Sequence, residues 1–218
     1  MRNLNNILVQ SLNFGISRIK LNEPKTYNAL SSKTLKSLIN IFRNLNNDNK
    51  TKVIIIEGLG KGFSAGHDLR EIRSLKKKSK YKKLFNLCSK LMLEIIEGKK
   101  PVIAKVHGAA FAAGCQLVAS CDLAISSDDA IFATPGVNIG LFCSTPMVAV
   151  SRKVSRKKTM KMILTGDSID AKYAKEIGLI NDHYPIIELE NKTLELAKKL
   201  HLNPVSQLKL EKKLFIDN

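Results

Sequence analysis

The sequence contains no tryptophan, only four cysteines in 218 residues, and no apolar run long enough to cross a bilayer. The cysteines form no C-x-x-C pair and have no histidine at the spacing of a zinc site, so we predict no metal centre and a reducing compartment. Residues 1–20 contain no continuous apolar block and no small-residue cleavage site, which argues against a signal peptide. We therefore predict a cytoplasmic protein without membrane insertion. We expect four buried thiols that pack as small apolar groups: Cys88, Cys115, Cys121 and Cys143.

Acidic residues are also scarce. The chain has 19 Asp and Glu against 36 Lys and Arg, a formal net charge of +17, and such a field attracts polyanions. Residues 70–83 hold eight basic residues and one acid, and residues 152–161 hold six and none. Nucleic acid is the less favoured partner, because Tyr81 is the only aromatic residue in either run and no nucleic-acid motif is present. The charge is equally compatible with solvated helix faces or with a small ligand that bears phosphate.

Hydrophobic residues make up 44% of the chain and charged residues 25%, which fits one globular domain over residues 1–218. Apolar periodicity predicts an N-terminal hairpin, an amphipathic helix, and buried strands that alternate with Gly-rich turns and helices. This order indicates an α/β architecture with right-handed crossovers. The predicted strands are residues 7–12, 16–21, 53–56, 101–106 and 123–126, and the predicted helices are residues 30–45, 69–96, 115–119, 146–163, 170–177 and 188–201.

Two small-residue turns follow two of these strands, where α/β sheets place their ligand crevices. The first, residues 62–69, leaves room for a ligand to approach the backbone at the N–H of His67. The second, residues 108–114, leads into a helix whose first N–H groups lack internal acceptors. Two such donors that converge on one oxygen form an oxyanion hole, which stabilises developing negative charge. Neither turn has the spacing of a Walker or Rossmann phosphate motif.

Three segments, LNEPKTYNALS, FSAGHDL and VHGAAFAAGCQLVASCDLAISS, resemble the crotonase superfamily of enoyl-CoA hydratase/isomerase proteins. The resemblance covers residues 7–215. It implies a crotonase-like fold, a ββα superhelix of stacked turns, with its C-terminal helical part truncated here at residues 188–218. It also implies an acyl-CoA-processing enzyme of fatty acid metabolism, in the lyase or isomerase class. The substrate would be a coenzyme A thioester, with no prosthetic group, and the assembly a homotrimer or a dimer of trimers.

The family's site residues are carried over by motif position. The oxyanion N–H groups fall on His67 and Ala113, and Lys25 falls near the CoA phosphates. The residues implied to contact the CoA adenine and pantetheine are Ala65, His67, Asp68, Leu69 and Arg70.

Two positions depart from the family. Hydration of an enoyl-CoA uses two glutamates, and the matching positions here are Gln116 and Gly136, neither of which can titrate. No Asp or Glu occurs from residue 130 to residue 166, so no acid on the following loop replaces them. The loss argues against hydration and favours decarboxylation or thioester hydrolysis. The alternatives are a non-catalytic acyl-CoA-binding protein and, less favoured, a basic RNA-binding protein.

Four other side chains near these motifs could carry chemistry. His67 titrates near neutral pH, but its backbone N–H is the expected functional group. Cys143 has no nearby histidine in sequence, so we expect it to pack rather than to act as a nucleophile. We predict that Asp68 caps the following helix and that Asp122 orders the turn before the third strand.

Overall fold

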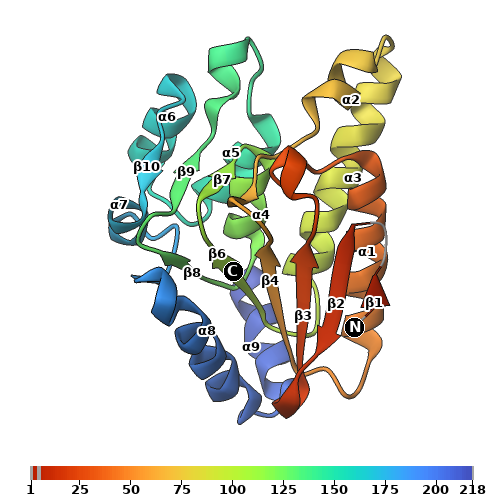
Figure 1. Cartoon of the computed structure of the whole chain (residues 1–218), viewed down its shortest axis with the longest axis vertical. Helices are drawn as coiled ribbons and strands as arrows, with labels where there is room; N and C mark the ends of the chain where they lie inside the picture. Colours follow the sequence, from red (N-terminus) through yellow and green to blue (C-terminus); the bar gives the residue numbers. More distant parts are fainter. Residues whose placement is uncertain (1, 4–5, 218) are drawn as a thin grey trace.

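Most strands of the protein form one seven-stranded sheet. The computed structural model describes residues 2–3 and 6–217 (Figure 1). The predicted hairpin is confirmed, with Ile7 paired to Leu21, and its second strand continues into a parallel sheet. The order of the sheet is β1-β2-β3-β4-β6-β8-β11. Its strands are β1 (Arg2–Asn3), β2 (Ile7–Ser11), β3 (Ile16–Leu21), β4 (Val53–Gly58), β6 (Val102–Val106), β8 (Leu123–Ser127) and β11 (Asp182–Tyr184).

A second sheet contains four short strands in the order β10-β9-β7-β5. After β4, β6 and β8 the chain passes each time into the next strand of this sheet, so each ββα unit contributes to both sheets. The strands are β5 (Gly62–Ser64), β7 (Ala109–Phe111), β9 (Ile131–Ala133) and β10 (Ile169–Asp170). The interpretation of both small-residue turns as pure loops was therefore wrong. Gly and Ala have little intrinsic strand preference, and neighbouring strands impose the extended conformation on them.

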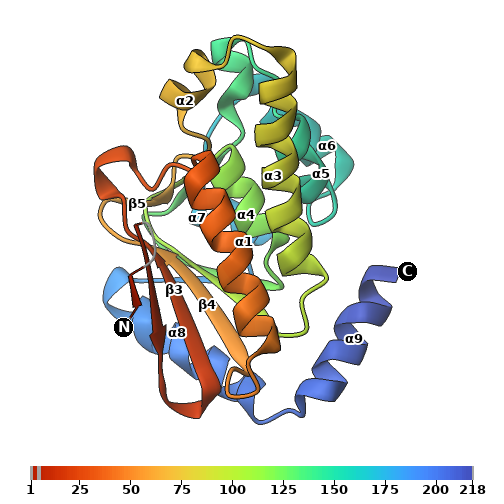
Figure 2. The ribbon, with the colours of Figure 1, turned by 90° about the vertical axis from the view of Figure 1, so that its right-hand side faces the viewer.

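Helices cover both faces of the large sheet (Figure 2). On one face lie α1 (Ser32–Asn47), α3 (Lys78–Ile96) and α4 (Ala113–Ser120), and on the other lies α8 (Ile186–His201). Strand β4 shows how one strand contacts the helices on both faces of the sheet. Ile54 and Ile56 pack toward α1 and α3, whereas Val53 and Ile55 pack toward α8. A strand buried on both faces needs an unbroken β-branched run, which is what the sequence has.

The predicted single helix over residues 69–96 is two helices, α2 (Leu69–Ser74) and α3. Leu75 and Lys77, between them, have extended backbone angles. One continuous helix would place Arg73 beside Lys77 and Lys76 beside Lys80, four residues apart, and such like-charge pairs weaken a helix. The predicted helix over residues 146–163 is likewise two helices, α5 (Ser144–Ser151) and α6 (Arg156–Thr165), followed by α7 (Ala171–Glu176).

The last helix, α9 (Val205–Asp217), stands away from the sheet in Figure 2. Lys212 attaches it to the body: its ammonium donates to the backbone oxygen of Ile95 at 2.8 Å and pairs with Asp122 at 2.8 Å. Asp122 also accepts the N–H of Val102 at 2.8 Å. Burial raises the pKa of Asp122, although Lys212 opposes the shift. The side chain of Asp122 thus ties its turn to the start of β6 and to α9.

Candidate functional site

The two small-residue turns are in direct contact. A Cβ atom on Gly66 would lie 2.9 Å from the backbone nitrogen of Ala113 and 2.8 Å from the oxygen of Phe111. A Cβ on Gly114 would lie 2.2 Å from the backbone oxygen of Ser64. Only glycine fits at either place, and Gly66 also has a φ of +89°. The backbone that leads to His67 therefore lies against the N-terminus of α4.

Ala112 has an unusual conformation next to this contact, with φ of 49° and ψ of −116°. A residue with a side chain rarely adopts such backbone angles, and residues that do so concentrate at functional sites. The N–H of Ala112 donates to the oxygen of Ala133 at 2.9 Å, which holds this conformation in place. The next amide, that of Ala113, belongs to the first turn of α4, where amides have no acceptor within the helix.

The amides of His67 and Ala113 are both available to a ligand. Within the described ranges 2–3 and 6–217, no acceptor is assigned to either N–H. The neighbouring groups are occupied instead: Gly66 accepts the N–H of Leu30 at 2.7 Å. The two turns therefore touch, and neither of these two amides has an acceptor within the described residues.

The imidazole of His67 is held in a mostly apolar environment. Its Nδ1 lies 3.3 Å from the oxygen of Leu30, and its ring packs edge-on against Phe85, with 5.4 Å between ring centroids. Burial lowers its pKa, and the contacts with Leu30 and Glu71 oppose that shift. The buried Nε2 has no hydrogen-bond partner among the described residues. At neutral pH the ring is therefore uncharged.

Gln116, at the position of the first glutamate, is buried on α4 with 4% of its surface exposed. The thiol of Cys88, on α3, donates to its Oε1 over 3.5 Å. Burial raises the pKa of Cys88 to about 12, so the thiol stays protonated and acts as a donor. A neutral amide held by a neutral thiol supplies no base.

Gly136, at the position of the second glutamate, lies in η3 (Pro135–Ile139) and has no space for a side chain. A Cβ there would lie 2.5 Å from the oxygen of Leu141 and 2.7 Å from the Sγ of Cys143. The loop folds back because the N–H of Leu141 donates to the oxygen of Gly136 at 2.9 Å. The space that a side chain at residue 136 would need is therefore filled by this chain's own loop. Cys143 is buried, and burial raises its pKa, as expected of a packing thiol.

The residues implied to contact CoA lie along one edge of the first turn. Ala65, Leu69 and Arg70 are exposed, and Lys25 is exposed in η2 (Pro24–Thr26). Asp68 accepts the N–H of Arg70 at 2.8 Å, which confirms its predicted role as the cap of α2. The amide of Ala65 donates to the oxygen of Tyr27 at 2.8 Å, which joins this turn to the segment of Lys25.

Asn28 is a positioning residue that the sequence analysis missed. Its buried side-chain amide donates to the oxygens of Leu59 at 2.8 Å and Gly62 at 2.9 Å. Its backbone oxygen accepts the hydroxyl of Ser64 at 2.9 Å, and that hydroxyl in turn accepts the N–H of Gly66 at 3.2 Å. Asn28 thus ties the first turn to the Lys25 segment. The only signal in the sequence was its place within the motif segment LNEPKTYNALS, because its burial and its φ of 54° come from the structure.

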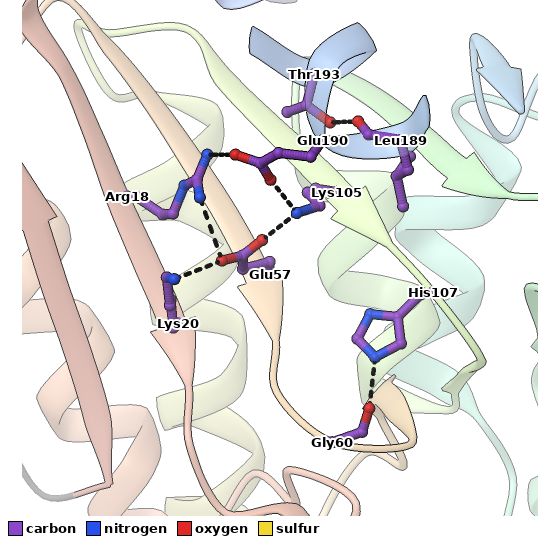
Figure 3. Close-up of polar contacts among 9 residues, drawn as sticks. All are labelled: Arg18, Lys20, Glu57, Gly60, Lys105, His107, Leu189, Glu190 and Thr193. Carbon is purple, nitrogen blue, oxygen red and sulfur yellow. Dashed lines mark hydrogen bonds and ion pairs between the residues drawn. The ribbon is translucent and has the colours of Figure 1, made fainter. Parts of the chain in front are cut away.

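A charged cluster on the α8 face of the sheet was also missed (Figure 3). Glu57 is 4% exposed and lies 2.8 Å from the ammonium of Lys105, 3.4 Å from that of Lys20 and 3.8 Å from the guanidinium of Arg18. Glu190 of α8 pairs with both Arg18 and Lys105. Each buried charge has an opposite partner, so removal of one partner would leave charge at the α8 interface less well compensated. Its members come from β3, β4, β6 and α8, which are far apart in sequence.

No group of three or more metal-ligating side chains occurs in the part of the chain that the structure describes. Nor does any helix there have the length and apolar content needed to span a bilayer.

Residues 11–217 match the sequence profile of the enoyl-CoA hydratase/isomerase family, and the chain belongs to that family. The human enoyl-CoA hydratase domain-containing protein 3, mitochondrial, is 48% identical over 85% of this chain and 61% of its own length. The zebrafish protein of the same name is 46% identical over 92% of this chain and 70% of its own length. The chain thus spans about three fifths to seven tenths of these relatives.

Solved structures confirm the predicted crotonase-like fold. An enoyl-CoA hydratase from Mycobacterium smegmatis superposes with a TM-score of 0.95 and 41% identity, over 97% of this chain and 82% of that one. The human enoyl-CoA hydratase domain-containing protein 3 superposes with a TM-score of 0.94 and 43% identity, over 98% and 84%.

The prediction of a cytoplasmic location was wrong. The human, zebrafish and mouse relatives all bear names that place them in mitochondria. The sequence argument depended on the lack of a recognisable leader in residues 1–20 and on unpaired thiols, and neither feature distinguishes cytoplasm from another reducing compartment.

Proposed function

We propose that this protein binds an acyl-CoA thioester and holds its carbonyl oxygen between the N–H groups of His67 and Ala113. The observation that carries the proposal is the contact between Gly66 and the backbone nitrogen of Ala113, with neither amide engaged elsewhere in the described residues. Membership of the enoyl-CoA hydratase/isomerase family supports the choice of a CoA thioester. Ala65, Asp68, Leu69 and Arg70 would contact the adenine and pantetheine, and Lys25 the phosphates.

The reaction is one that needs no carboxylate from the protein. Water addition requires one group to deprotonate water and another to protonate the α-carbon, and Gln116 and Gly136 can do neither. Decarboxylation of a malonyl-type thioester suits the site better. The bond from the α-carbon to the carboxylate breaks, carbon dioxide leaves, and the electron pair spreads onto the carbonyl oxygen as an enolate. The two amides stabilise that oxyanion, and water supplies the proton. Thioester hydrolysis passes through an oxyanion at the same place.

The location, the metabolic role and the assembly of the protein are also proposed from its family and its relatives. The names of the relatives support a mitochondrial location, and their family supports a role in acyl-CoA or fatty acid metabolism. A homotrimer or a dimer of trimers remains the proposed assembly.

The test is turnover of a panel of malonyl-type, saturated and α,β-unsaturated CoA thioesters. Gly66→Ala pushes a methyl group into the nitrogen of Ala113 and should lower kcat by about 10²- to 10³-fold, the usual effect of losing one oxyanion donor. Gly140→Ala is the matched control. Gly140 also has a positive φ, of 69°, but nothing lies within 4 Å of its added Cβ. Equal loss in both variants, or no consumption of any thioester, would refute the enzymatic proposal.

A non-catalytic acyl-CoA-binding protein is the second candidate. The closed space at Gly136 favours it. The chain lacks the acid at this position, and its own loop also occupies the volume that such an acid would need. This function predicts tight binding of a CoA thioester by calorimetry with no turnover. Gln116→Glu should then leave hydration at background, because the second acid still has no place.

A further inference from the structure

A groove runs along the outer surface of the molecule between α1 and α3. The two helices pack side by side and run in the same direction (Figure 2). Near their N-terminal ends the groove forms a cleft of about 500 Å³, which is lined by both helices and by Leu75. Near their C-terminal ends it forms a second cleft of about 400 Å³, and both clefts are lined by Lys90. The groove is therefore one continuous feature of the surface.

The groove is long enough to hold a helix. Most of its lining residues on α3 recur every three or four positions, from Lys80 through Leu87 to Glu97, so they form one stripe that faces α1. A helix rises about 1.5 Å per residue, so the interval from Lys80 to Glu97 spans about 25 Å. A single phosphate would occupy only a fraction of this length. A partner helix of about 16 residues would fill it.

The N-terminal half of the groove is strongly basic. Its exposed rim holds four lysines, one from α1 and three from α3: Lys36, Lys80, Lys83 and Lys90. None of the four has a carboxylate within 4 Å among the described residues, because the neighbouring acids are engaged elsewhere. Glu71 accepts the N–H of Ser32 at 2.8 Å, and Glu94 pairs with Arg43. The positive ends of both helix dipoles lie in this half and add to its potential.

The floor between the lysines is apolar. Leu84 is buried there, and Leu75 and Leu87 are half-buried and line the cleft. In the other half of the groove, Leu93 is 48% exposed. An apolar strip with a charged rim is the kind of surface that binds one face of an amphipathic helix.

We propose that this groove binds an acidic amphipathic helix of a partner protein. Apolar side chains at intervals of three and four residues along that helix would lie on the floor, and carboxylates beside them would pair with the rim lysines. Opposite charge would also accelerate the association at low salt. The groove lies on the outer side of α1 and α3, and its occupation does not depend on any reaction at the amides of His67 and Ala113.

Three other occupants fit the groove less well. Nucleic acid would satisfy the lysines, but the described residues that line the groove include no aromatic side chain on which bases could stack. A second copy of the chain in a symmetric contact would bring the lysines of both copies together, and like charges repel across an interface. The flat surface of a bilayer would meet the rim and leave the concave floor uncovered. An acidic helix satisfies both the charge and the floor.

The experiment is titration of the full chain into three fluorescein-labelled peptides of about 16 residues, with fluorescence anisotropy as the readout. The first peptide has leucine at every third or fourth position and glutamate elsewhere. The second has lysine in place of glutamate, and the third has the composition of the first with its leucines distributed around the helix. The first peptide should bind, and its affinity should fall as salt rises. The other two should bind at least about tenfold more weakly.

Charge reversal locates the bound peptide. Lys36→Glu with Lys83→Glu, one change on each helix, should weaken binding of the first peptide by at least about tenfold, because two attractive contacts become repulsive. Lys199→Glu with Lys209→Glu is the matched control. Both lysines are exposed, on α8 and α9, and the net charge of the chain changes by the same amount. The control should bind the peptide nearly as well as the unchanged chain.

Failure of the first peptide to bind overturns the proposal. Equal losses from both pairs of changes, or equal affinity for the first and third peptides, also overturn it. Single-stranded RNA that binds, when the peptide does not, and that only Lys36→Glu with Lys83→Glu weakens, would assign the groove to nucleic acid instead. An oligomer that only this pair of changes dissociates, without peptide binding, would assign it to a second copy of the chain.

Discussion

Glu57 offers a demanding test of the packing between the sheet and α8. Glu57→Gln keeps the shape of the side chain and removes its charge, which leaves Arg18, Lys20 and Lys105 with Glu190 alone. Lys20 can turn toward water because its side chain is 21% exposed, but Arg18 is only 8% exposed and Lys105 15%. The loss therefore falls on two largely buried cations. Leaving a buried ion without any partner costs about 3–5 kcal/mol. Arg18 and Lys105 each keep Glu190, so we expect a smaller loss of unfolding free energy, about 1–3 kcal/mol.

Equilibrium urea unfolding at neutral pH measures this loss, as a lower midpoint with an unchanged slope. Glu94→Gln is the control, because its partner Arg43 has a side chain that is 45% exposed and solvent screens the pair. The change at Glu57 should be several times more destabilising than the change at Glu94. Equal effects would show that the cluster does not stabilise the α8 interface, and a changed slope would show that the variant alters the unfolded state instead.

Two further outcomes follow from pKa shifts caused by burial. His67 has a pKa below its usual 6.5, so its neutral form contributes stability that is complete above that value and is lost as pH falls through the folded pKa. His67→Ala should therefore flatten the decline in urea midpoint between about pH 7 and pH 5, and an unchanged decline would contradict the burial of the ring. Burial raises the pKa of Cys88 and of Cys115 to about 12, so iodoacetamide should label them only after unfolding, as mass spectrometry would show. Rapid labelling of the folded protein would place these thiols outside the core.

Elements with strong local signals were predicted correctly. The β-branched run of β4 identified a strand buried on both faces, and the amphipathic pattern over residues 30–45 identified α1, whose N-cap Ser31 accepts the N–H of Thr34 at 3.2 Å. The strands β5 and β7 were missed because their residues carry no such signal, and pairing between distant segments imposes their conformation.

The positions of the two backbone amides in the candidate site could be predicted from the sequence, but the side-chain packing around them could not. Small residues and a helix start indicated where the amides of His67 and Ala113 would lie. The sequence shows a glycine at residue 136, but it does not show that the sulfur of Cys143 fills the space beside it, because a turn of the loop brings the sulfur there. The ion pair of Arg18 with Glu190 joins residues 172 positions apart, and no local pattern predicts such a contact.

The central claim is that two backbone amides hold one thioester oxygen, and the carbonyl stretch of a bound acyl-CoA measures this most directly. An isotope-edited infrared spectrum of a thioester labelled with ¹³C at its carbonyl should show a band at lower wavenumber on the protein than in water. The shift should persist in Gly140→Ala and disappear in Gly66→Ala. A bound thioester whose carbonyl band stays where it lies in water would contradict the account.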